Sequence, residues 1–170
     1  MTGHALEVLE FERVLERVAR RASSDAGKAR ILALRPKTEV RDVERELTRV
    51  AATIRFLSTA SNWHPGPIPD VAGALAQLPV EGALLDPVSI HRLGLLLGSS
   101  RSLLGEIRSH EGGYAELDAL IDRLVELPEL ERAVDSCVDD EGNVLSSASA
   151  DLKKIRDRLR GAHAKIVRSL

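Results

Sequence analysis

The sequence predicts an all-α fold, a multi-helix bundle with a long C-terminal helix. Apolar residues make up 44% of the 170 residues and recur at helical spacing along most of the chain. Aromatic residues make up only 2%, so the core has to be built from Leu, Val, Ala and Ile, a mixture that suits helix-on-helix packing. The one long stretch that cannot be helical is residues 60–69, which contain three prolines.

Three helices are expected before this stretch. The first covers about residues 4–21, and the second begins at a cap formed by Ser24 or Asp25 and ends before Pro36. The third begins after Thr38, and its apolar residues repeat at alternating three- and four-residue steps. These residues are Val40, Val43, Leu47, Val50, Ile54 and Leu57. We predict that they face the core of the bundle, and dimerisation through them is the alternative.

Helical spacing resumes after the proline-rich stretch. A short helix follows Asp70. Asp86 is a favourable N-cap and Pro87 suits the first helical position, so a long helix begins there and reaches about Ser109. This helix is apolar on several sides and should therefore be the most buried element. Glu111, Gly112 and Gly113 are expected to end it.

Two helices and a hairpin are expected next. Residues 114–127 form one helix, and Pro128 begins another that ends near Cys137. An acidic turn follows, and Val144 and Leu145 are expected to pair with Val138 as a short β-hairpin within residues 138–145. In the helix over residues 114–127, the inward-facing residues are predicted to be Leu117, Leu120, Ile121 and Leu124.

The C-terminal helix begins at a cap formed by Ser147 or Ser149. One narrow seam of it is apolar: Leu152, Ile155, Leu159, Ala162 and Ile166. The rest of its surface is basic and supplies the candidate DNA-binding residues: Lys153, Lys154, Arg156, Arg158, Arg160, Lys165 and Arg168. No Gly, Asn or Pro ends this pattern before Leu170, so we expect a helix that continues in a longer protein and a seam that rests on later polypeptide.

The net charge of −2 is the sum of a basic C-terminal helix and an acidic remainder of the chain. Residues 151–170 carry seven basic and two acidic side chains, whereas the other 150 residues carry a net charge of −7. A polyanion would therefore avoid most of the chain and tolerate only the terminal helix. Phosphate contact is one interpretation of the basic residues, and a solvated helix surface is the other.

The residues indicate no catalytic, cofactor or metal site in this chain. Gly27-Lys28 does not form a phosphate-binding loop, because Ala22 and Ala29 replace the required glycine and hydroxyl residue. The acidic turn at 139–142 lacks the ligand spacing of a calcium loop. Cys137 is the only cysteine, which agrees with a reducing cytoplasm, and no apolar run reaches the roughly 18 residues of a membrane span.

Several stretches of the chain resemble the N-terminal region of the second bacterial MutS paralogue. The resemblance is most specific over residues 124–160, where an acidic turn, a small-residue cap and a Leu-x-x-Ile-Arg helix occur in order. Ser146 and Ala150 depart from the pattern, since the family usually has Asp and Pro there. The matching residues include Leu9-Glu10-Phe11, Gly27-Lys28, Leu34-Arg35-Pro36, Ile68-Pro69-Asp70-Val71, Leu127-Pro128-Glu129-Leu130 and residues 138–145.

The resemblance implies a helical core domain over residues 1–148 and the start of a lever helix, leading to a DNA clamp, over residues 149–170. It implies that the full-length parent is an ATPase and endonuclease that uses ATP and Mg²⁺ and suppresses homologous recombination. This segment would be non-catalytic. The implied partners are double-stranded or branched DNA and a second parent subunit that pairs through other regions, with no membrane. The alternative is a helical protein-interaction module or a ribosome-binding module for the rescue of collided ribosomes, with no direct DNA contact.

Overall fold

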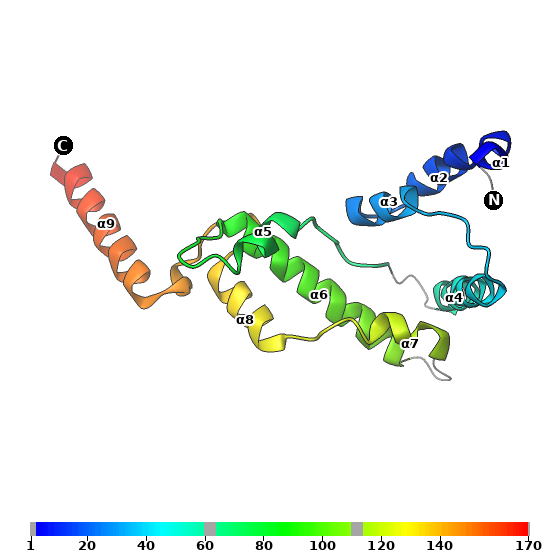
Figure 1. The fold of residues 1–170 in the computed structure, drawn as a ribbon. Helices are drawn as coiled ribbons and strands as arrows, with labels where there is room; N and C mark the ends of the chain where they lie inside the picture. The colour runs from blue at the N-terminus through cyan, green and yellow to red at the C-terminus, as the bar shows by residue number, and fades with distance from the viewer. Residues whose placement is uncertain (1–2, 60–63, 110–113, 170) are drawn as a thin grey trace. The chain divides into compact units, whose positions relative to one another are not determined.

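The structure is a computed structural model that describes residues 3–59, 64–109 and 114–169. Helices account for most of these residues, and no strand occurs among them (Figure 1). Val138 and Val144 form an isolated antiparallel bridge. The all-α fold is therefore confirmed, and so is the pairing of Val138 with Val144. The elements are α1 (Gly3–Val8), α2 (Phe11–Ala19), α3 (Asp25–Leu32), α4 (Val40–Thr59), α5 (Ala72–Gln77), α6 (Pro87–Ser109), α7 (Ala115–Ile121), α8 (Pro128–Cys137), a 3₁₀ turn η1 (Ser146–Ala148) and α9 (Ala150–Ser169).

The chain forms two compact units whose boundary passes through α6. Unit 1 consists of residues 1–70 and 95–126, so it holds α1 to α4, the second part of α6, and α7. Unit 2 consists of residues 71–94 and 127–170, so it holds α5, the first part of α6, α8, η1 and α9.

The core of unit 1 joins α4, α6 and α7. Ala52 and Phe56 of α4 pack with Ile107 of α6, and Tyr114 and Leu117 complete the cluster. The rings of Phe56 and Tyr114 meet edge to face with their centroids 5.5 Å apart, an arrangement that aromatic quadrupoles favour. The Tyr114 hydroxyl lies 2.8 Å from the hydroxyl of Thr59, so the polar group of this buried ring has a hydrogen-bond partner.

Residues 64–69 lie against α6 within unit 1. Ser99 donates a hydrogen bond of 2.8 Å to the carbonyl of Pro67. A Cβ at Gly66 would collide with the Ser99 side chain, so only glycine permits this approach. Ser99 thus serves as a small residue at this contact. Trp63 lies outside the described residues.

Unit 2 is held by small contacts around α6 and α8. Val71, Ala74, Val134 and Val138 are its buried apolar side chains among the described residues. Asp86 begins α6 as predicted, since its carboxylate accepts hydrogen bonds from the Ser89 amide at 2.9 Å and from the Ser89 hydroxyl at 2.6 Å.

The predicted first helix is two helices, α1 and α2. Glu10 separates them with a left-handed backbone (φ 49°, ψ 39°), a conformation that costs a non-glycine residue roughly 1 kcal/mol or more. The Glu10 carboxylate accepts a hydrogen bond of 2.7 Å from Arg13, and α2 packs against α3. Packing on α3 therefore sets the direction of α2, where the apolar periodicity alone predicts a continuous helix.

The prediction that the α4 stripe faces the core is wrong. The exposed fractions of Val40, Leu47, Val50, Ile54 and Leu57 are 68%, 63%, 55%, 60% and 53%. Ala52 and Phe56 are buried instead, and at 100° per residue they lie on the opposite side of the helix. The aromatic ring of Phe56 buries more apolar area than an aliphatic side chain does. The face of α4 that carries Phe56 therefore packs in the core.

Two further expectations about the helices differ from the structure. The helix that follows Tyr114 ends at Ile121, and Leu120 is 46% exposed instead of pointing inward. In α6, Leu104 and Ile107 are buried, and residues 93–100 are all half-buried, so this helix is surrounded on several sides as predicted. The Glu111-Gly112-Gly113 stop lies outside the described residues.

The two leucines of α7 give a matched test of this core. Leu117 is 5% exposed and Leu120 is 46% exposed on the same helix. We expect Leu117→Ala to lower the free energy of unfolding by about 2–5 kcal/mol, because it leaves a cavity in the cluster. Leu120→Ala should cost less than about 1 kcal/mol. Urea unfolding followed by circular dichroism measures both, and equal losses would contradict the assignment of the buried face.

Candidate nucleic-acid interface

The cap of α9 is built from serines. Ser149 accepts a hydrogen bond of 3.0 Å from the amide of Leu152, which confirms Ser149 as the N-cap. Ser147 donates a hydrogen bond of 3.0 Å to the carbonyl of Ser136 and thereby ties η1 to α8. These contacts fix the first turn of α9 within unit 2.

The two departures from the family pattern leave this cap intact. Ser146 stands where Asp is usual, and its hydroxyl accepts a hydrogen bond of 3.0 Å from Arg156. Ala150 stands where Pro is usual, at the first residue of α9. A proline there would only pre-set a backbone angle that the helix already has.

The seven candidate residues share one broad face of α9. At 100° per residue they span roughly 200° of the circumference, and the apolar seam fills the remainder. Lys153, Lys154 and Arg168 project from the side opposite the seam, whereas Arg156, Arg158 and Lys165 flank it. The structure thus brings all seven onto one helix, as the sequence predicted.

Few of these cations are neutralised within the chain. Lys154 lies 3.4 Å from Asp151, and Arg160 lies 2.6 Å from Asp157, and both pairs are exposed. Among the described residues no carboxylate pairs with Lys153, Arg158 or Lys165. Exposed pairs within one helix are worth little, so the cations remain available to an external anion. These exposed cations can bind phosphate groups along one face of α9.

The apolar seam of α9 is largely exposed. Leu152 is half-buried beside η1, but Ile155, Leu159 and Ile166 are 61%, 68% and 59% exposed. α9 is therefore amphipathic, and most of its apolar side is exposed. Its basic and apolar sides are separate surfaces.

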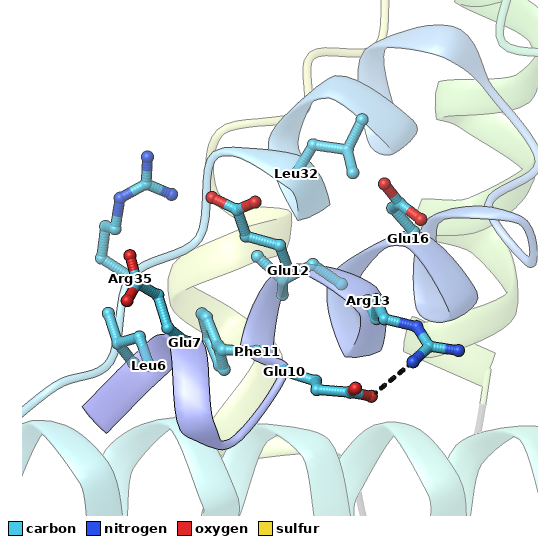
Figure 2. A pocket seen from close by; sticks show the side chains of 10 residues that line it. Leu6, Glu7, Glu10, Phe11, Glu12, Arg13, Glu16, Leu32 and Arg35 are labelled. Atoms are coloured by element: carbon cyan, nitrogen blue, oxygen red, sulfur yellow. Dashed lines mark hydrogen bonds and ion pairs between the residues drawn. The ribbon is translucent and has the colours of Figure 1, made fainter. Parts of the chain in front are cut away.

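A groove in unit 1 was missed by the sequence. It has a volume of about 670 Å³, and its apolar lining includes Leu6, Phe11 and Leu32 (Figure 2). Four glutamates surround it, and the left-handed turn at Glu10 creates it by changing the direction between α1 and α2. No glycine or proline marks this turn, so no local signal could reveal the groove. Its lining residues are Leu6, Glu7, Glu10, Phe11, Glu12, Arg13, Leu15, Glu16, Leu32 and Arg35.

The weaker sequence candidates have structural explanations. The amide of Gly27 donates a hydrogen bond of 3.1 Å to the Ser24 hydroxyl, so it is already used in the cap of α3. His64 is exposed in an irregular segment. No three His, Cys, Asp or Glu side chains come together as metal ligands in the part of the chain that the structure describes. None of the helices searched there is long and apolar enough to cross a membrane.

The acidic turn before α9 is stabilised by Asp139. Its carboxylate accepts hydrogen bonds from the amides of Asn143 (2.7 Å) and Glu141 (3.1 Å), and Gly142 adopts φ +76°. The Asp139 carboxylate thus holds the turn together. The Asn143 N–H is the main cause that lowers the pKa of Asp139.

Asp139 should make the stability of the chain depend on pH. Because its pKa is lower in the folded state, its contribution is full above the ordinary aspartate pKa of about 3.9 and is lost as the pH falls through the folded-state pKa. We expect Asp139→Asn to lower the melting temperature at pH 7, and the difference from the unmodified chain to shrink below about pH 4. Asp140→Asn is the control, since its carboxylate accepts no hydrogen bond from a described residue. A difference that stays constant from pH 7 to acid would contradict the role of the carboxylate.

Comparison with known proteins gives one consistent set of relatives. No family profile matches the chain. Curated proteins named Endonuclease MutS2 match it over 98–100% of its length: 35% identical in Gemmatimonas aurantiaca, 31% in Geobacillus thermodenitrificans and 28% in Bacillus velezensis. The chain spans about a fifth of the length of these relatives, 21% in each case.

Proposed function

Because the chain corresponds to an N-terminal segment of the MutS2 endonucleases, we propose that it is the non-catalytic core segment of a MutS-like DNA-binding ATPase and endonuclease. In this proposal α9 is the start of a lever that connects the ATPase to a DNA clamp, and the parent suppresses homologous recombination. ATP, Mg²⁺ and the dimer contacts of the parent belong to regions other than this segment.

The charge of α9 is the observation that carries the proposal. Residues 151–170 have a net charge of +5, whereas the other 150 residues have −7. Phosphates bind through unneutralised Lys and Arg side chains, and here these side chains occur together on one exposed helix. The acidic remainder repels DNA, so electrostatics directs a duplex to α9 alone.

The contacts are expected to be with the DNA backbone and not with base edges. Lysine and arginine along a single exposed face position a duplex without reading its sequence. Aromatic side chains, which would stack on unpaired bases, amount to only 2% of the residues. A duplex or branched duplex is therefore a better substrate than a single strand.

Charge removal from the side of α9 opposite the seam tests the proposal. We expect the 1–170 chain to bind linear and branched duplex DNA at low salt. The triple variant Lys153→Gln, Lys154→Gln, Arg168→Gln should lose most of this affinity. If all three touch phosphates, the slope of log K against log salt should fall by about 0.9 for each, since fewer counterions are released. Fluorescence anisotropy at several salt concentrations measures both quantities.

The matched control is Arg17→Gln, Arg30→Gln, Arg41→Gln. These three arginines are exposed and lie in α2, α3 and α4, and their loss changes the net charge by the same amount. The control should bind like the unmodified chain. Equal weakening by both triple variants would show that net charge alone matters and would overturn α9 as the interface.

A further inference from the structure

Arg156 differs from the other six candidate DNA-binding residues, because its guanidinium binds a residue that precedes the helix. It donates a hydrogen bond of 3.0 Å to the hydroxyl of Ser146 in η1. α9 and η1 both belong to unit 2 and pack against each other. Arg156 is half-buried, whereas the other six side chains are exposed. Its surroundings are therefore those of an internal contact and not of an open basic surface.

The half-buried residues of α9 show which side of this helix meets η1. Leu152 and Arg156 are half-buried, and the other side chains of residues 150–168 are exposed. The two residues are four positions apart, so they lie on one side of the helix, one turn after the other. The Ser149 cap and the hydrogen bond between Arg156 and Ser146 together hold the first two turns of α9 on η1.

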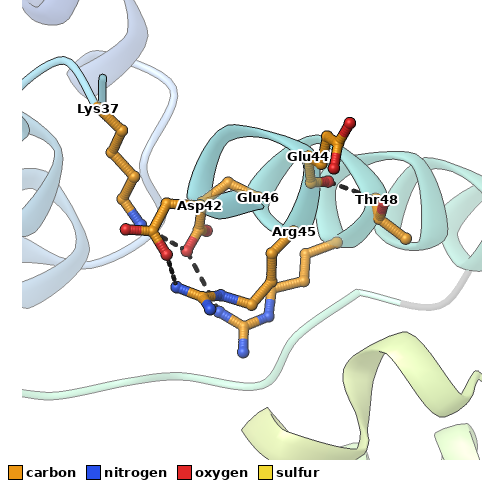
Figure 3. A network of polar contacts seen from close by, with 7 residues as sticks. Lys37, Asp42, Glu44, Arg45, Glu46 and Thr48 are labelled. Carbon is orange, nitrogen blue, oxygen red and sulfur yellow. Dashed lines mark hydrogen bonds and ion pairs between the residues drawn. The ribbon is translucent and has the colours of Figure 1, made fainter. Parts of the chain in front are cut away.

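The start of α4 in unit 1 has the same arrangement. Lys37 precedes α4 and donates a hydrogen bond of 2.9 Å to Glu46, the seventh residue of that helix (Figure 3). Arg156 is likewise the seventh residue of α9. In both helices a side chain of the second turn is tied to the segment that precedes the first turn. The first N–H groups of a helix have no partner within it, so such a contact opposes fraying at the weakest point.

This contact limits what Arg156 can do for DNA. The guanidinium is a planar group with a fixed set of donors, and its bond to Ser146 sets the direction of that plane. A DNA phosphate on Arg156 would have to compete with the Ser146 oxygen and release α9 from η1. Lys153 and Lys154 lie in the same turns, are exposed, and can reach a phosphate without breaking this contact.

We propose that Arg156 is a positioning residue, which fixes the first two turns of α9 against η1 through the Ser146 hydroxyl. Lys153 and Lys154 are thereby held on a stable helix, and Arg156 itself does not touch phosphate. The part of this role that concerns DNA rests on the function proposed above. The contact between Arg156 and Ser146 acts within unit 2 whether or not DNA is bound.

A double-mutant cycle on the two partners tests the contact. Ser146→Ala and Arg156→Gln each remove the hydrogen bond, so the first turn of α9 should open more often. The amides of Leu152 and Lys153 should then exchange with solvent roughly fivefold faster. The double variant should exchange no faster than either single variant, because all three lose the same contact. Nuclear magnetic resonance measures these exchange rates.

Two further variants separate the contact from net charge and from global stability. Arg158→Gln removes the same charge at an exposed position roughly 160° around the helix from Arg156, and it should leave both exchange rates unchanged. Ser146→Asp supplies a charged acceptor, which binds a guanidinium more strongly than a hydroxyl does, and should slow the exchange. This slowing should disappear when Arg156→Gln is added, a pattern that a general change in stability would not produce.

Duplex binding gives a second readout. Ser146→Ala keeps every cation, yet it should weaken binding about threefold, because the turns that carry the two lysines open more often. Arg156→Gln should weaken binding by a similar factor, with a slope of log K against log salt close to that of the unmodified chain. Lys153→Gln, in contrast, should reduce the magnitude of this slope by about 0.9. Fluorescence anisotropy at several salt concentrations measures both quantities.

Two results would overturn the positioning role, and a third concerns DNA alone. Unchanged amide exchange in Ser146→Ala and in Arg156→Gln would show that the contact does not hold α9. A slope reduced by about 0.9 in Arg156→Gln would make this residue a phosphate contact. An unmodified chain that binds no duplex would overturn the DNA proposal, whereas the exchange rates would still decide whether Arg156 fixes α9.

Discussion

The edge-to-face contact between Phe56 and Tyr114 is the interaction on which unit 1 depends. The chain has few aromatic residues, and two of them meet here with a centroid distance of 5.5 Å. This contact joins α4 to the start of α7, and Ile107 of α6 closes the same cluster. A cluster this small has room for one face of α4 only. The aliphatic stripe of α4 is consequently left outside this core.

Unit 2 is organised differently, by hydrogen bonds to serine and aspartate. Ser147 ties η1 to α8, Ser149 caps α9, and Asp139 holds the turn before them. Neutral and charged hydrogen bonds of this kind give direction to the backbone, because each has a narrow range of distance and angle. The start of α9 is thus defined, while its basic face and its apolar seam both remain accessible. The basic face carries the proposal for DNA.

The MutS2 relatives and the charge distribution support the same interpretation from independent directions. Relatives named as endonucleases match the whole chain, yet the chain spans only 21% of their length. The described residues bring together no group of metal-ligating side chains.

The sequence by itself determined the existence of most helices, the cap at Asp86, two candidate caps each for α3 and α9, and the basic face of α9. These features are local: helical spacing, capping and charge on one helix depend on residues within a few positions of one another. Only the tertiary structure decided which face of α4 is buried, the break at Glu10, the exposure of Leu120 and the groove beside α2. Each of these depends on competition between distant side chains for a small core, and the spacing of residues along one helix contains no information about that competition.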